Sequence, residues 1–245
     1  MWRAAIDGLR LSFHLAGINN QNFLMRDDQT GTYWQQISGR AISGPLAGRQ
    51  LTRVPSDELT FALWKSEQPQ GTVLDDVAVF RTQYAAKDWD VRMRRAPTVL
   101  SYPESGVAAR ELIVGLRASG ASRAFPYDAV LAHRLIQDRV GSELVVLVTG
   151  PDGKSVRAFR SHIPGTAAVA EFYRLLQSTA TPASSLFMDS ATGSQWDFQG
   201  CAVSGPSHGI CLDRLEALKD YWFDWRNYNP ATSFYKEPAQ PGPPR

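Results

Sequence analysis

The sequence lacks any long apolar run and any excess of charge of one sign. No stretch of about 18 apolar residues occurs, which excludes an ordinary membrane-spanning helix. Residues 1–15 alternate rather than forming an apolar block, so we expect no signal peptide in them. Lys and Arg number 26 against 24 Asp and Glu, and no basic block is interleaved with aromatic residues. We therefore expect no nucleic-acid partner.

Residues that bind metals or act as catalysts are also few. The chain has two cysteines and four histidines, and the histidines are too scattered in sequence to indicate a metal site: His14, His133, His162 and His208. No closely spaced pair of carboxylates indicates a glycosidase. We expect no metal and no cofactor, and whether the protein is an enzyme stays open.

The composition is that of a folded protein, and its clearest feature is a repeat. The 245 residues are 43% hydrophobic and 11% aromatic, enough for a substantial core. Residues 39–51 and 200–212 align at an offset of about 161, with Ser-Gly-Pro at the same place in both. The same offset pairs Trp64 with Trp225 and Pro69 with Pro230. After a slip of one residue, Asp27, Thr30, Gly31 and Trp34 fall on Asp189, Thr192, Gly193 and Trp196.

This pattern predicts an α+β fold that is predominantly antiparallel β, with two related units from an internal duplication. Short segments separated by Gly, Asn, Asp and Pro are typical of antiparallel strands. Aromatic residues at helical spacing before a proline predict a short Trp-bearing helix in each unit, over residues 57–68 and 215–229. Further helices are expected over 85–95 and 127–136, a hairpin over 112–126 and a buried strand over 143–149.

The repeat also predicts the organisation of the chain. We expect a first unit over residues 1–80, truncated at its start because a hairpin turn at Asp7-Gly8 leaves little room for its first strand. A connecting segment follows over 81–110, and the second unit covers 111–235. Residues 236–245 hold four prolines and form a tail that we expect to be extended or disordered.

Two stretches of the chain resemble a known family. Residues 27–51, with their aspartate, Thr-Gly, Trp and Ser-Gly-Pro-Leu-Ala-Gly, and residues 221–230, Tyr-Trp-Phe-Asp-Trp-Arg-Asn-Tyr-Asn-Pro, resemble the bacterial domain-of-unknown-function family 3179. The resemblance implies a related fold and no particular activity. It also implies a His-containing helix, to which residues 132–138 are similar, and a Cys-Pro-Leu-Cys-Gly turn. Here Thr-Gly-Pro-Asp-Gly, residues 149–153, stands in place of that turn.

The two cysteines support a specific prediction. Cys201 and Cys211 lie five residues on either side of Pro206, so a hairpin centred on that proline brings them opposite each other. A disulfide there would indicate an oxidising compartment, periplasmic or extracellular. Two reduced, buried cysteines are the alternative and would fit a cytoplasmic protein. The first unit has Arg40 and Gln50 at the same places.

A polar loop supplies the candidate ligand-binding residues. His14 precedes a cluster of uncharged hydrogen-bonding side chains, and the candidates are His14, Asn19, Asn20 and Asn22. Amide groups both donate and accept hydrogen bonds, which suits a sugar, a peptide or another small polar ligand. The same residues are also common in turns.

Two apparent motifs are rejected on context. Residues 205–209 match Gly-x-Ser-x-Gly but lie between short strands, whereas a nucleophile elbow connects a strand to a helix. Residues 150–155 look like a phosphate-binding loop, but Val148 occupies the position of its first glycine. The sequence thus favours a non-catalytic binding or accessory module of the cell envelope, with a small polar ligand or a protein as partner. The alternative is an enzyme with a site at the interface of the two repeats.

Overall fold

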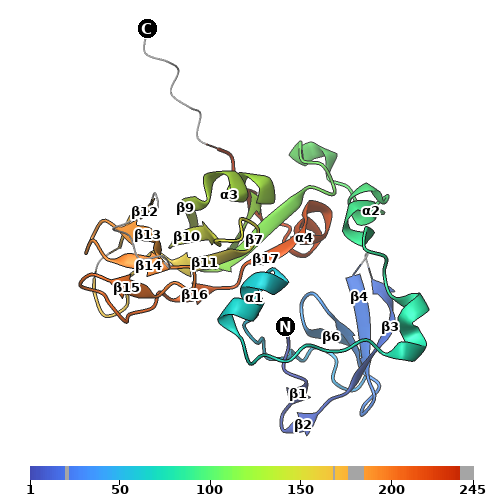
Figure 1. Ribbon diagram of the computed structural model, residues 1–245. Coiled ribbons are helices and arrows are strands. Elements are labelled where there is room, and N and C mark those ends of the chain that lie inside the picture. The colour runs from blue at the N-terminus through green and yellow to red at the C-terminus, as the bar shows by residue number, and fades with distance from the viewer. Residues whose placement is uncertain (20–21, 168, 176–184, 238–245) are drawn as a thin grey trace. The chain divides into compact units, whose positions relative to one another are not determined.

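The computed structural model describes residues 1–19, 22–167, 169–175 and 185–237. The chain is rich in antiparallel β-sheet and has few helices, as the sequence predicts (Figure 1). Contacts between Cα atoms divide it into two compact units. Unit 1 comprises residues 1–56, 97–111 and 221–230, and unit 2 comprises residues 57–96, 112–220 and the chain from 231 onward.

Unit 1 contains a small hairpin and one four-stranded sheet. The hairpin joins β1 (Ala5–Ile6) to β2 (Leu9–Arg10) through Asp7 and Gly8, whose φ angles of 47° and 82° are those of a tight two-residue turn. The sheet has the order β3-β4-β5-β6, all antiparallel: β3 (Phe13–Asn19), β4 (Asn22–Asp27), β5 (Tyr33–Gln35) and β6 (Arg40–Ser43). The unit also holds η2 (Pro103–Ser105) and α4 (Trp222–Tyr228).

Unit 2 contains three four-stranded sheets. The first has the order β16-β11-β10-β9: β16 (Arg214–Leu215), β11 (Val156–Arg160), β10 (Glu143–Thr149) and β9 (Leu135–Val140). The second has the order β12-β13-β14-β15: β12 (Phe172–Arg174), β13 (Ser185–Asp189), β14 (Gln195–Asp197) and β15 (Ala202–Ser204). The third has the order β17-β7-β8-β18: β17 (Leu218–Tyr221), β7 (Leu112–Ala118), β8 (Ala121–Pro126) and β18 (Ser233–Phe234), of which β18 runs parallel to β8.

The helices of unit 2 are short. They are α1 (Phe61–Glu67), η1 (Ala78–Gln83), α2 (Trp89–Arg95) and α3 (Tyr127–His133). The expected helices over 85–95 and 127–136 are therefore present but shorter than predicted. Helix α3 packs against β9 and β10 (Figure 1), and its end at His133 leads directly into β9.

The two Trp-bearing helices occupy unexpected places in this division. The first and last residues of α4 each lie 161 positions after those of α1. The residues that cap the C-terminal ends, Gln68 and Asn229, have nearly the same backbone angles: φ −128° and ψ 66° for Gln68, φ −133° and ψ 67° for Asn229. Helix α1 follows the strands of unit 1 in sequence but belongs to unit 2, whereas α4 follows the strands of unit 2 and belongs to unit 1. The expected helix over 215–229 is wrong in its first half, because β17 occupies 218–221.

Each unit has its own apolar core. In unit 1, Trp34 is fully buried with Leu11 and Leu51. In unit 2, Trp196 is equally buried, in a cluster to which α1 contributes Leu63. A second cluster of unit 2 packs β7 and β8 against α3 and the neighbouring sheet through Val114, Phe125, Val130 and Val145.

Candidate functional site

A buried aspartate organises the turn between β4 and β5 of unit 1. One carboxylate oxygen of Asp27 accepts a hydrogen bond from the indole Nε1–H of Trp34 at 2.8 Å, and the Thr30 hydroxyl donates to the carboxylate at 2.9 Å. Burial alone would raise the pKa of Asp27, but these bonds and those from backbone N–H groups outweigh it and lower the pKa. The charged carboxylate therefore holds the turn together.

The turn between β13 and β14 of unit 2 has the same construction. The Trp196 indole donates to Asp189 at 2.9 Å, and the Thr192 hydroxyl donates to the same oxygen at 2.8 Å. Burial opposes the charge of Asp189, but bonds from Thr192, Trp196 and Ser194 outweigh it and lower its pKa. We call these two groups the Asp27 hub and the Asp189 hub. Both tie one turn to one buried Trp.

A glycine packs against each hub. Gly44 and Gly205 have φ angles of 105° and 88°, which glycine alone adopts easily. A Cβ atom on Gly44 would lie 2.8 Å from the Cα atom of Thr32, and one on Gly205 would lie 2.7 Å from the Cα atom of Ser194. Both glycines therefore allow a close backbone approach, which accounts for the glycine of the Ser-Gly-Pro motif in each segment.

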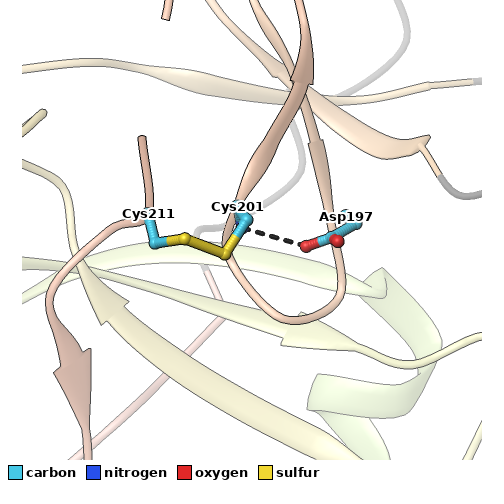
Figure 2. The surroundings of a disulfide bond; sticks show 3 residues. All are labelled: Asp197, Cys201 and Cys211. Carbon is cyan, nitrogen blue, oxygen red and sulfur yellow. Dashed lines mark hydrogen bonds between the residues drawn. A yellow bond between two sulfur atoms is a disulfide. The ribbon is translucent and has the colours of Figure 1, made fainter. Parts of the chain in front are cut away.

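The hairpin after the Asp189 hub carries a disulfide (Figure 2). Cys201 and Cys211 form an isolated antiparallel bridge, their Cα atoms are 3.9 Å apart and their sulfur atoms 2.03 Å apart. The Asp197 carboxylate accepts a hydrogen bond from the Cys201 N–H at 2.9 Å, which fixes the start of the hairpin. Arg40 and Gln50 form the corresponding bridge in unit 1. The structure contains the predicted disulfide.

Three of the predicted ligand-binding residues, His14, Asn19 and Asn22, lie on β3 and β4 but do not form one group. Asn19 pairs with Asn22 across the hairpin, whereas His14 is five positions earlier on β3 and about 16 Å away along an extended strand. Asn20 lies outside the described residues. The His14 Nδ1 atom is 2.7 Å from Asp28, and both side chains are about half exposed.

Asn22 faces a buried carboxylate that the sequence did not single out. Its amide Nδ2 donates to Asp224 Oδ2 of α4 at 2.9 Å, and Asp224 is only 6% exposed. Burial raises the pKa of Asp224, and the bond from Asn22 only partly offsets this effect. The remaining side-chain oxygens, Asn22 Oδ1 and Asp224 Oδ1, are buried without a hydrogen-bond partner. Because 202 positions separate the two residues, no local pattern could have paired them.

The two rejected motifs are turns. Residues 205–209 connect β15 to Cys211 with no helix, and Ser207 is buried with its backbone N–H bonded to Ser194. Residues 150–155 form the turn between β10 and β11. Asp152 in that turn accepts hydrogen bonds from Ser155 and from the Thr60 hydroxyl. Burial raises its pKa, but these bonds dominate and lower it to about 2.

Unit 2 contains a cavity of about 380 Å³. Its lining comes from three places: the junction of α3 and β9, the end of β10 with the turn that follows, and the end of β12 with the start of β13. Its walls combine two arginines with apolar side chains and the backbone of the turn after β10: Arg134, Leu135, Val148, Thr149, Gly150, Pro151, Arg174, Leu175 and Leu186. The volume lies within the range of small-molecule sites. Arg134 and Arg174 are 40 positions apart, so sequence analysis missed the pair.

Other features of potential functional value are not found in the described ranges. No group of three or more His, Cys, Asp or Glu side chains there is arranged to hold a metal ion. None of the helices in these ranges has both the length and the apolar character that crossing a membrane requires.

Comparison with known proteins identifies the family. The profile of DUF3179, described as a protein of unknown function, matches residues 1–232. The chain therefore belongs to the DUF3179 family, which confirms the resemblance found in the sequence. Searches of curated proteins and of solved structures gave no match.

Proposed function

We propose that this chain is a non-catalytic binding module of the bacterial cell envelope. The observation that carries the proposal is the composition of the unit 2 cavity. It has the size of a ligand site, but its described lining offers no carboxylate, imidazole or thiol for acid–base or nucleophilic chemistry. The Thr149 hydroxyl in the lining already donates to the Val130 carbonyl at 3.0 Å. Such a lining supports binding more than it supports a reaction.

The disulfide supports the location. Bonded cysteines persist in oxidising compartments and are rare where glutathione and thioredoxin keep thiols reduced. The cell envelope and the extracellular space are such compartments. A free-thiol assay on the unreduced, denatured protein checks this part of the proposal. We expect no titratable thiol from Cys201 and Cys211, and two titratable thiols in protein from its own host would refute the location.

We also propose that the two hub regions descend from one duplicated segment. The matching hydrogen bonds of Asp27 and Asp189, and the matching close approaches at Gly44 and Gly205, support this origin. In this view the repeats cover residues 1–80 and 111–235, joined by 81–110. These repeats are stretches of sequence, and they do not coincide with the two compact units because α1 and α4 are exchanged between them.

The polar residues of the β3–β4 hairpin are a second candidate site. Asn19, Asn22 and His14 could bind a small polar ligand, with Asn20 beside them in sequence. The pairing of His14 with Asp28 also favours a second function, that of an enzyme, because a carboxylate on Nδ1 orients an imidazole as a general base. Hydrolysis of p-nitrophenyl acetate above the buffer rate, lost in His14→Gln, would support the enzyme. We expect no such activity, since both side chains are open to solvent.

The binding proposal is tested with a panel of small molecules and a filled cavity. The probes are hexanoate, hexyl phosphate, hexanol, glucose and diglycine, and the readout is the melting temperature. A ligand at about 100 times its dissociation constant stabilises the folded state by about 2.7 kcal/mol, a shift of several degrees. We expect at least one probe to produce such a shift, and Leu135→Trp, which fills the cavity, to abolish it.

Leu74→Trp is the matched control, because Leu74 is 99% exposed and does not line the cavity. This variant should bind as the unmodified chain does. The proposal fails if no probe raises the melting temperature, or if Leu135→Trp binds every probe as well as Leu74→Trp does.

A further inference from the structure

We propose that the unit 2 cavity binds an amphiphilic organic anion, with a carboxylate or phosphate headgroup and a short hydrocarbon chain. This inference rests on the proposed binding function and specifies its ligand class. It is argued from the charge of the cavity, from its apolar wall and from the backbone conformation at Arg134.

The charge comes from two arginines that have no partner among the residues described. Neither the Arg134 nor the Arg174 guanidinium makes a hydrogen bond or an ion pair there. By contrast, six other arginines of unit 2 are each paired with a carboxylate: Arg81, Arg92, Arg123, Arg157, Arg160 and Arg214. A guanidinium presents five N–H donors in a planar fork that matches carboxylate and phosphate oxygens. Two such groups in one cavity therefore favour an anionic headgroup.

The rest of the wall is suited to hydrocarbon. Leu135 and Val148 are neighbours across the β9–β10 pair, and Leu175 and Leu186 complete the apolar lining. Burial of a ligand's CH₂ groups against such side chains is favourable, at about 0.8 kcal/mol for each. A bare inorganic anion would leave this wall uncovered, so the ligand should carry both parts.

Arg134 has a backbone conformation that glycine adopts more easily than arginine does. Arg134 has φ 63° and ψ −21°, the left-handed conformation that commonly follows a helix and strongly favours glycine. Its N–H donates to the Val130 carbonyl at 2.9 Å, and its carbonyl accepts from the Thr149 N–H at 2.8 Å. The chain thus keeps a charged side chain beside the cavity at some cost in backbone strain, as binding sites often do.

A nearby carboxylate does not supply the missing partner. Asp152 follows the lining residues Gly150 and Pro151, and its pKa of about 2 keeps it charged at neutral pH. Its oxygens accept hydrogen bonds from the Lys154 and Ser155 N–H groups and from the Ser155 and Thr60 hydroxyls. Asp152 is therefore committed to the turn and to α1, which leaves the two guanidinium groups for a ligand.

The experiment compares matched probes by titration calorimetry on the intact, unreduced chain. Hexanoate and hexyl phosphate have both an anionic headgroup and a six-carbon chain. Hexanol and hexylamine have the same chain with a neutral or a cationic headgroup. Acetate and inorganic phosphate have the anionic group without the six-carbon chain. The variants are Arg134→Gly, Arg174→Gln and, as a control, Arg95→Gln on the exposed α2. Arg134→Gly should fold at least as stably as the unmodified chain, because glycine relieves the left-handed strain, so a loss of binding in it does not reflect unfolding.

We expect hexanoate or hexyl phosphate to bind at least ten-fold more tightly than hexanol, hexylamine, acetate and inorganic phosphate. Arg134→Gly and Arg174→Gln should each weaken this binding about ten-fold or more, and Arg95→Gln should not. Whichever headgroup binds more tightly identifies the natural class.

Equal binding of hexanol and hexanoate, unaffected by the arginine variants, would overturn the anionic ligand and leave the binding function standing. Equal affinities for acetate and hexanoate would contradict the claim that the ligand carries a hydrocarbon chain. Absence of binding by all probes, with no shift in melting temperature by glucose or diglycine, would overturn both this inference and the proposed function.

Discussion

The Asp27 hub of unit 1 and the Asp189 hub of unit 2 differ in what surrounds them rather than in how they are built. Each joins a charged, buried aspartate to the indole of a fully buried Trp, and each has a glycine in close backbone contact. The next hairpin is closed by Arg40 and Gln50 in one unit and by a disulfide in the other. The buried polar group is thus the same in both units, whereas the cross-strand pair that closes the next hairpin differs.

The two exchanged helices differ more strongly. Helix α1 is held in unit 2 by Arg157, which is 4% exposed and pairs with Asp57 and Glu67 at 2.7 Å each. Helix α4 is held in unit 1 by the bond between Asn22 and Asp224 and by the Tyr228 hydroxyl, which donates to the Asn19 carbonyl at 3.3 Å. Two helices of the same length, 161 positions apart in sequence, are therefore docked in different ways: α1 uses a buried group of ion pairs in addition to hydrogen bonds, and α4 uses hydrogen bonds.

Removal of either hub aspartate should have the largest effect. Asp27→Ala and Asp189→Ala each leave a buried indole N–H without an acceptor and remove the acceptor of a Thr hydroxyl and a Thr N–H in the turn, at about 1–3 kcal/mol for each buried group. We expect each variant to lower the free energy of unfolding by about 4 kcal/mol in urea titrations followed by circular dichroism. Asp28→Ala, an exposed neighbour, should cost far less. A large loss of stability in one of these two variants but not in the other would show that the two hubs do not contribute alike.

Loss of the buried arginine should come next. Arg157→Met removes the partner of Glu67 and one of the two partners of Asp57, and breaking a buried ion pair costs about 3–5 kcal/mol. We place the loss near 3 kcal/mol, because Asp57 keeps Arg214 as a second partner. Arg160→Met is the control: its more exposed pair with Glu143 should contribute about 1 kcal/mol or less. Equal effects of the two variants in urea would contradict the proposed docking of α1.

Opening the disulfide should cost somewhat less. The closed loop is short, with a sequence separation of 10, and constraint of the unfolded chain by such a loop gives about 2–3 kcal/mol. The double variant Cys201→Ser with Cys211→Ser should show this loss in urea without reducing agent. Dithiothreitol should destabilise the unmodified chain and leave the double variant unchanged.

The first unit should accept the same bond. Arg40 and Gln50 form the bridge that Cys201 and Cys211 form in unit 2, so Arg40→Cys with Gln50→Cys should oxidise to a disulfide. We expect a gain of about 1–2 kcal/mol, smaller than the natural bond contributes, because engineered disulfides often deliver less. Thiol titration and urea unfolding measure the two effects. Persistent free thiols under oxidising conditions would show that the hairpins differ in backbone path.

The pH dependence of α4 docking should be the smallest effect. Burial raises the pKa of Asp224 above its ordinary value of 3.8. Its contribution to stability is therefore fully present below that value and is lost as the pH rises through the raised folded-state pKa. Asp224→Asn should remove this loss, so the variant should gain stability relative to the unmodified chain between pH 4 and neutral pH. A parallel pair of stability–pH curves would contradict a raised pKa at Asp224.

Local sequence patterns predicted the turns well. Asp7-Gly8 and the Ser-Gly-Pro motifs demand particular backbone angles, and the structure has turns at each. The disulfide was predictable because a hairpin centred on Pro206 brings two residues at equal distances from it face to face. Such features depend on a few neighbouring residues, which a sequence displays directly.

Features that depend on distant segments were not predictable. Aromatic spacing over 215–229 predicted one helix, but β17 takes its first half because Leu218–Tyr221 pairs with β7, which lies about 100 residues earlier. The partner of Asn22 and the pairing of Arg134 with Arg174 in one cavity depend equally on tertiary structure. The candidate ligand residues were chosen by residue type alone, and only Asn19 and Asn22 lie opposite each other.

The most direct test of the account is hydrogen exchange of the indole N–H groups of Trp34 and Trp196, measured by NMR on the unmodified chain. Both groups donate to a buried, charged aspartate, so both should exchange slowly and at rates within about ten-fold of each other. Asp27→Ala should release only Trp34, and Asp189→Ala should release only Trp196. Rapid exchange of either indole in the unmodified chain would show that the two hubs are not built alike.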